Sequence, residues 1–145
     1  MNSTNSTRVL RVLVTTVASD SHSWNLVYLQ LMLEEMGHIV DNLGPCAPVD
    51  EMIARCLESR PDLVVVSSVN GHGYADGMRL ISTLRSHRDL RGIPVVIGGK
   101  LGIHGTENQD HTDRLLLAGF DAVFSDGGGL RSFESFVRQL PAGAA

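Results

Sequence analysis

An aspartate and a histidine stand two residues apart where an apolar run gives way to a helical pattern. The stretch ASDSHSWNL, residues 18–26, directly follows the apolar run of residues 12–17, and it contains Asp20 and His22. A neutral imidazole binds a metal through one ring nitrogen, and a carboxylate that accepts a hydrogen bond from the other nitrogen fixes its tautomer. Asp20 or Ser23 would equally serve as the N-cap of the following helix. Taken alone, the stretch leaves a metal ligand and a helix start both open.

Alternating strands and helices must position these residues. β-branched runs predict strands at residues 9–17, 38–43, 63–69, 94–97 and 122–124. Helical spacing of apolar residues predicts helices at residues 24–36, 49–59, 74–87, 110–118 and 130–140, with Gly37 and Gly119 placed as C-caps. Five successive strand-helix units predict an α/β fold: a flavodoxin-like, doubly wound, five-stranded parallel sheet in order 2-1-3-4-5, with helices on both faces.

The length of the chain predicts a single domain. The chain has 145 residues, of which 43% are hydrophobic and 19% are charged. This is enough for one buried core and too short for two ordinary domains. We predict a flexible tail at residues 1–7, the domain at residues 8–140 and a disordered tail at residues 141–145.

Charge and hydropathy argue against several kinds of partner. The net charge is −4 and the sequence shows no cluster of Lys and Arg, so we expect binding to neither nucleic acid nor a membrane. No apolar stretch approaches the length that spans a bilayer, and the N-terminus lacks a cleavage site, so we expect the cytoplasm. Cys46 and Cys56 match no disulfide or metal pattern, which predicts ordinary thiols, with Cys56 on a helix face.

Small residues follow the strands of the predicted sheet. In a sheet of this order the ligand crevice lies outside the carboxyl ends of the strands. The segments at this edge are residues 19–25, 67–73, 98–102 and 125–129. Their glycines and serines let a ligand approach the backbone closely. No Walker A sequence is present and no G-x-G-x-x-G pattern follows the first strand, so the sequence predicts a roomy crevice with one positioned imidazole rather than a nucleotide-phosphate loop.

Three other sites on such a fold are disfavoured. A phosphoacceptor receiver domain needs an aspartate at the end of the third strand, where Ser67 and Ser68 stand. A flavin site would need aromatic residues around the ring, and few lie near the crevice. His72 and His104 fall in crevice loops and could join His22 around zinc, but no H-x-x-x-H or C-x-x-C spacing supports this.

Three of these strand ends together resemble the motifs of cobalamin-binding domains, written D-x-H-x-x-G, S-x-L and G-G. The matching residues are Asp20-Ser21-His22, Ser67-Ser68-Val69 and Gly98-Gly99, in the family's order and each at the expected strand end. The resemblance extends from about Val9 to Leu140. It is closest to the small cobalamin-binding subunits of glutamate mutases, particularly in the phrases VVVSSVNGHG and VIGGK.

The resemblance implies that cobalamin is bound base-off and histidine-on. His22 would be the lower axial ligand of cobalt, with Asp20 holding its other ring nitrogen. The displaced nucleotide tail would enter a slot between the sheet and the first helix, where Ser67 would hydrogen-bond its base. Val69 would pack nearby, and Gly98 and Gly99 would leave room. The other predicted cofactor-binding residues are Ser19, Ser21, Ser23, Asn25, Ser68, Gly71, Lys100, Leu101 and Gly127.

Two motif positions depart from the family pattern. Val69 replaces the leucine of the second motif, which is a small change in volume. Asn25 replaces the glycine that closes the first motif and so adds a side chain where the family has none. That side chain would hydrogen-bond the tail, narrow the slot or indicate an altered partner. Two interpretations of Lys100 stay open: a solvated loop residue and a contact for an anion.

The resemblance implies the cofactor-carrying subunit of an adenosylcobalamin-dependent carbon-skeleton mutase that converts glutamate to methylaspartate. The substrate would be bound by a separate, larger, barrel-shaped subunit, so this chain would be inactive alone. Two alternatives stay open. One is a corrinoid protein that carries a methyl group between methyltransferases, which usually has a helical domain ahead of this one. The other is a non-catalytic cobalamin-binding module for sensing or delivery.

Overall fold

The computed structural model describes residues 9–16, 26–44, 48–68, 73–99, 105–124 and 129–140. The predicted tails and most of the predicted cofactor loops lie outside these ranges. No helix among the described residues is long and apolar enough to cross a membrane.

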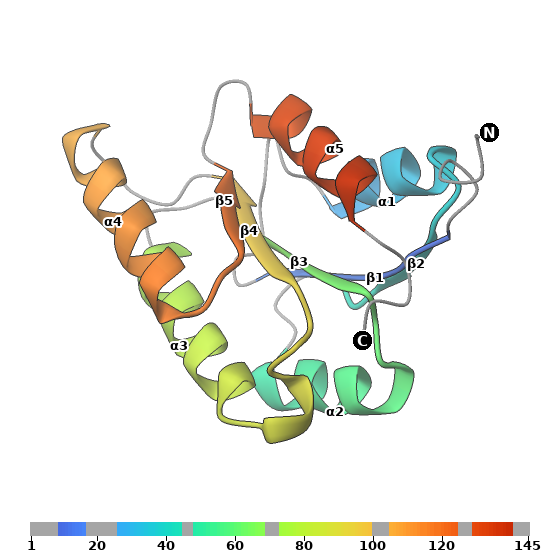
Figure 1. Ribbon diagram of the computed structural model, residues 1–145, viewed down its shortest axis with the longest axis horizontal. Helices are drawn as coiled ribbons and strands as arrows, with labels where there is room; N and C mark the ends of the chain where they lie inside the picture. The colour runs from blue at the N-terminus through green and yellow to red at the C-terminus, as the bar shows by residue number, and fades with distance from the viewer. Residues whose placement is uncertain are drawn as a thin grey trace.

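A five-stranded parallel sheet in the order β2-β1-β3-β4-β5 forms the centre of the molecule (Figure 1). Its strands are β1 Arg11–Thr16, β2 Ile39–Asn42, β3 Leu63–Ser68, β4 Val95–Gly99 and β5 Ala122–Phe124. The connecting helices are α1 Leu26–Glu35, α2 Val49–Ser59, α3 Gly73–Arg85, α4 Gly105–Ala118 and α5 Gly129–Gln139, with the short 3-10 helix η2 at Arg88–Leu90. The predicted fold class and strand order are confirmed.

Helices cover both faces of the sheet, with α1 and α5 on one side and α2, α3 and α4 on the other (Figure 1). Alternate strand residues point to opposite faces. Val12, Val14 and Val65 therefore pack with Leu29 of α1 and Phe133 of α5. Their neighbours along the strands pack on the other face, in a cluster that includes Leu13, Val64, Val66, Met52, Ile81 and Leu115. Burial on both faces explains why these strands are continuously apolar.

Glycines end two of the helices as predicted. Gly37 after α1 has a φ of 98° and Gly119 after α4 has a φ of 134°, values that residues with a Cβ rarely adopt. Several boundaries shift from the prediction by one or two residues, and β4 continues to Gly99 rather than ending at residue 97. α4 begins at Gly105 rather than at residue 110, and η2 was not expected. The first turn of α4, GTENQ, carries no apolar residue, so its sequence has no periodic signal.

Candidate functional site

Four residues from four strands form a row across the carboxyl edge of the sheet. Thr16 of β1 lies opposite Ser67 of β3, Ser67 lies opposite Gly98 of β4, and Gly98 lies opposite Phe124 of β5. Ser67 is two residues beyond Val65, which packs under α1 and α5, so the row belongs to that face of the sheet. We call Thr16, Ser67, Gly98 and Phe124 the edge row.

On β3 and β4 the side chains on the face under α1 and α5 become smaller toward this edge. The preceding row on that face consists of Val14, Val65, Val96 and Ala122. The edge row replaces its three valines with threonine, serine and glycine, all of them buried. On the opposite face Val66 and Ile97, both fully buried, precede Ser68 and Gly99, the last pair between β3 and β4. The space under the first and last helices therefore has few bulky side chains at the ends of β1, β3 and β4.

A buried hydrogen bond joins two members of the edge row. The Thr16 hydroxyl Oγ1 donates to the carbonyl oxygen of Ser67 at 2.5 Å. This bond adds a side-chain link to the backbone ladder between β1 and β3. It holds together the two strand ends from which residues 17–25 and residues 69–72 continue. Thr16, the last described residue before the segment with Asp20 and His22, is thereby held against β3.

The structure describes four of the predicted cofactor-binding residues and brings them together. Ser67 lies opposite Gly98 and Ser68 lies opposite Gly99, so the second and third motifs end on adjacent strands. The other predicted site residues lie outside the described residues: Ser19, Asp20, Ser21, His22, Ser23, Asn25, Val69, Gly71, Lys100, Leu101 and Gly127. Within the ranges that the structure describes, no group of three His, Cys, Asp or Glu side chains could hold a metal ion.

Sequence reasoning missed Thr16 and Phe124. The Phe124 ring meets Phe133 and Phe136 of α5 edge-on, with centroids 5.7 Å and 5.9 Å apart, and so forms an aromatic boundary at one end of the edge row. A signal for Thr16 was available. Thr16 follows Val12 and Val14 at alternate positions of the strand. The alternation therefore predicts that its hydroxyl group lies on the same face of the sheet as those valines.

Two titratable side chains lie in other parts of the fold. The His38 ring nitrogen Nδ1 accepts a hydrogen bond from the Leu10 N–H at 3.1 Å, immediately before β2 begins. Partial burial lowers the pKa of His38. Cys56 lies on helix α2, as predicted, and is fully buried in the core, where burial raises its pKa to about 11. At neutral pH this thiol stays protonated and unreactive.

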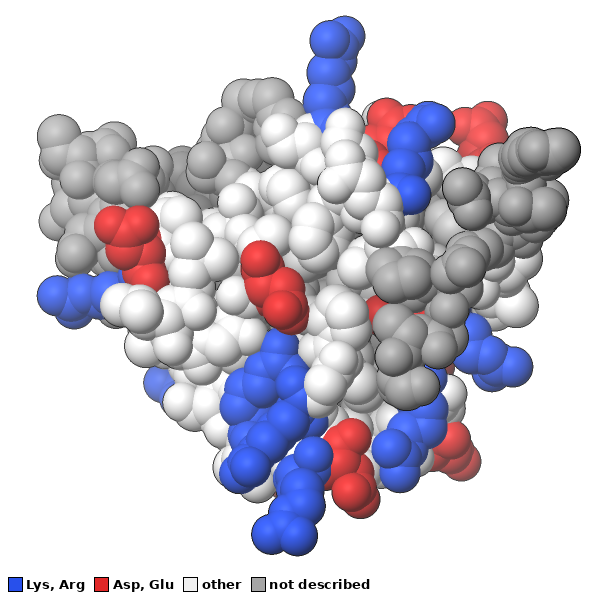
Figure 2. Space-filling view, viewed as in Figure 1, with Lys and Arg blue, Asp and Glu red and all other residues white. Residues whose placement is uncertain are grey.

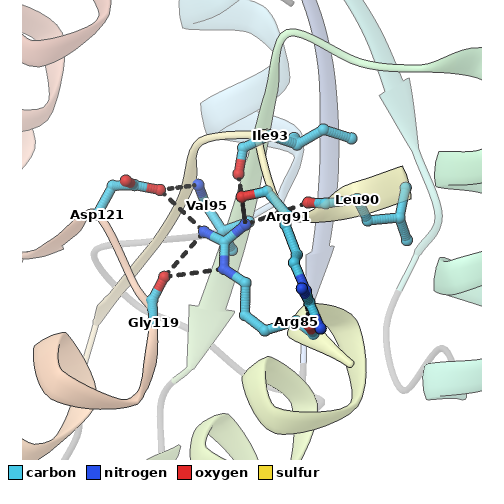
Figure 3. A network of polar contacts seen from close by, with 7 residues as sticks. All are labelled: Arg85, Leu90, Arg91, Ile93, Val95, Gly119 and Asp121. Carbon is cyan, nitrogen blue, oxygen red and sulfur yellow. Dashed lines mark hydrogen bonds and ion pairs between the residues drawn. The ribbon is translucent and has the colours of Figure 1, made fainter. Parts of the chain in front are cut away.

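Arginine side chains gather where α3 ends and η2 follows, at the bottom of the view in Figure 2. Arg85 donates hydrogen bonds to four carbonyl oxygens and pairs with the Asp121 carboxylate at 3.1 Å (Figure 3). The acceptors are Leu90, Arg91, Ile93 and Gly119, at 2.8–3.2 Å. Asp121 also accepts the Val95 N–H at 2.8 Å. This network lies where β4 and β5 begin, so it positions strands and is remote from the edge row.

A family profile described as "B12 binding domain" matches residues 10–130. The chain belongs to the B12-binding domain family. This B12-binding domain is 32% identical to a protein named glutamate mutase sigma subunit from Treponema denticola, over 83% of this chain and 86% of the relative. It is also 32% identical to the protein of that name from Halobacterium salinarum, over 79% of this chain and 75% of the relative. The resemblance read from the motifs is confirmed.

Solved structures show the same fold. A cobalamin-binding protein from Desulfitobacterium hafniense matches with a TM-score of 0.67 and 20% identity over 87% of this chain, which spans 58% of that protein. A signal receiver domain of a histidine kinase from Syntrophus aciditrophicus matches with a TM-score of 0.64 and 23% identity, over 90% of this chain and 89% of that one. The B12-binding domain and the receiver thus share a backbone. In the sequence, Ser67 and Ser68 stand at the end of β3, where a phosphoacceptor receiver needs an aspartate.

Proposed function

We propose that this chain binds cobalamin and serves as the cofactor-carrying subunit of a glutamate mutase. The observation that carries the proposal is the edge row, in which Ser67 and Gly98, members of two cofactor motifs, lie opposite each other. The first motif, with Asp20 and His22, follows directly from the neighbouring strand β1. Similarity to glutamate mutase sigma subunits along about four fifths of the chain supports the same function.

The residues at this edge fit the cofactor. An extended nucleotide tail needs a slot with few bulky side chains and with polar groups that orient it. In the edge row Ser67 and Gly98 are small, and Thr16 and Ser67 carry hydroxyl groups. In our proposal Ser67 hydrogen-bonds the base of the tail, and Gly98 and Gly99 leave room for it. His22 would hold cobalt through one ring nitrogen, and Asp20 would accept a hydrogen bond from the other ring nitrogen and so fix the tautomer.

The chain's own residues bind and orient the cofactor. Cobalamin supplies radical chemistry through its cobalt–carbon bond when the adenosyl form is bound. We propose that this form binds base-off and histidine-on, that glutamate is converted to methylaspartate on a separate barrel-type subunit, and that the complex works in the cytoplasm. The two relatives compared above are named sigma subunits of glutamate mutase, which favours this role over a methyl carrier or a sensor.

The absorption spectrum tests the histidine ligand. We expect the purified chain mixed with adenosylcobalamin to give a base-off, histidine-on spectrum, and His22→Ala to lose the histidine-on form. His87→Ala is the matched control, because His87 stands beside η2 and away from the edge row. Asp20→Asn should keep the ligand and weaken cobalamin binding about tenfold. An unchanged spectrum in His22→Ala would refute the assignment of the ligand.

Substitutions in the edge row test the tail slot. Gly98→Val fills the space next to Ser67 and should abolish cobalamin binding, while Gly98→Ala should weaken it. Ile97→Val is the control, because Ile97 lies on the same strand and packs on the opposite face. Circular dichroism would confirm that each variant is folded. If folded Gly98→Val bound cobalamin like the wild type, the tail would lie elsewhere.

Turnover tests the role as a carrier. We expect no conversion of glutamate to methylaspartate by this chain with adenosylcobalamin alone, and activity once a large mutase subunit is added. Turnover by the single chain would contradict the proposal.

A further inference from the structure

Helix α1 exposes apolar side chains on the side away from the core. Val27, Tyr28 and Leu31 are 59%, 51% and 60% exposed. Residues three and four apart on a helix are neighbours, so these three side chains form one surface, which we call the α1 patch. The opposite side of the helix is buried through Leu29 and Leu33. A helix at the surface of a monomer normally carries polar residues on its outer face.

The α1 patch lies toward the carboxyl edge of the sheet. The end of α1 is anchored at the other edge, because His38, which follows the helix, accepts the Leu10 N–H, and the Ile39 N–H donates to the Leu10 carbonyl at 2.9 Å. Leu10 immediately precedes β1. The first turns of α1, which contain the patch, therefore point toward the edge where β1, β3 and β4 end. The patch begins five residues after His22 in the sequence.

The α1 patch alone is too small for a stable interface with any partner. Three large side chains that are each about half exposed offer on the order of 300 Å². A stable complex buries about 800 Å² on each partner. The patch must therefore be part of a larger contact. The adjoining surface that would complete it is the cofactor edge.

We propose that the α1 patch is a docking surface for the large catalytic subunit of the mutase, which covers the patch and the cofactor face together. This inference rests on the proposed function. The charged residues of α1 are Glu34 and Glu35, both exposed, and the helix has no basic residue. The matching surface of the large subunit is apolar and has Lys or Arg side chains opposite these two glutamates.

Charged substitutions test the docking surface. Val27→Glu and Leu31→Glu place a carboxylate in the proposed contact at exposed helical positions. The control is Leu117→Glu, because Leu117 is 87% exposed in the last turn of α4, on the opposite face of the sheet. Each purified variant is loaded with adenosylcobalamin. Its spectrum, its thermal unfolding midpoint and its affinity for the glutamate mutase large subunit are then measured.

We expect Val27→Glu and Leu31→Glu to weaken association at least tenfold, with the cobalamin spectrum and the unfolding midpoint unchanged. Leu117→Glu should associate like the wild type. Wild-type affinity in both α1 variants would overturn the docking surface while leaving the proposed function intact. Equal weakening by Leu117→Glu, or a wild-type dimer that the α1 variants dissociate, would also overturn it. A wild-type chain that does not bind cobalamin would instead refute the proposed function.

Discussion

Arg85 should contribute more to the stability of this domain than any ordinary surface arginine. Its side chain is only 18% exposed, and its guanidinium contacts the four carbonyl oxygens and the Asp121 carboxylate of Figure 3. A planar guanidinium satisfies several acceptors at once because its donors are held in a fixed fork. Replacement by methionine keeps most of the apolar stem and removes every donor. The carbonyls of Leu90, Ile93 and Gly119 then lose a charged partner in partly buried surroundings.

The expected loss follows from these contacts. One hydrogen bond to a charged group contributes about 1.5–3 kcal/mol, but contributions to one guanidinium are not additive and water reaches the contacts with Arg91 and Asp121. We expect Arg85→Met to lower the free energy of unfolding by about 3 kcal/mol. In a domain of this size that lowers the unfolding midpoint by about 9 °C. Arg85→Lys should cost about 2 kcal/mol, because one ammonium cannot reach all the acceptors.

Urea unfolding followed by circular dichroism measures the change. The control is Arg138→Met, since Arg138 is 65% exposed and makes a single i,i+4 pair with Glu134 at 2.6 Å. This substitution should cost less than about 0.5 kcal/mol. Equal stability losses in the two methionine variants would refute the reasoning.

Three further predictions concern the packing and titration of single residues. Gly77→Val should cost about 2 kcal/mol in urea unfolding, because a Cβ there would lie 2.8 Å from the Ile97 side chain, whereas Gly92→Val, with open space around it, should cost much less. Because the pKa of His38 is lowered in the fold, the unfolded chain takes up its proton first. Stability should therefore fall as the pH drops below about 6.5, and less steeply in His38→Gln. Cys56 should resist a thiol reagent at pH 8 until urea unfolds the protein, as peptide mapping would show; labelling of the native chain at this position would contradict its burial.

The sequence predicted the fold because the fold depends on periodic patterns. Continuous β-branched runs are typical of parallel strands that helices cover on both faces. The residues of β1, β3 and β4 are buried on both faces in this way. Gly37 and Gly119 marked two helix ends because a left-handed backbone strongly favours glycine. The first turn of α4 was missed because polar residues alone carry no periodic signal.

Some residues of the candidate site could also be predicted from the sequence, and others could not. Sequence alone named Ser67 and Gly98, since each stands where an apolar run ends. It did not show that Thr16 and Phe124 share their row, because the register between strands is set by packing on both faces of the sheet and is not written in any one segment. Nor did it show the α1 patch. The sequence of α1 is apolar nearly all round, and only the tertiary structure decides which of its side chains the core buries and which it leaves for a partner.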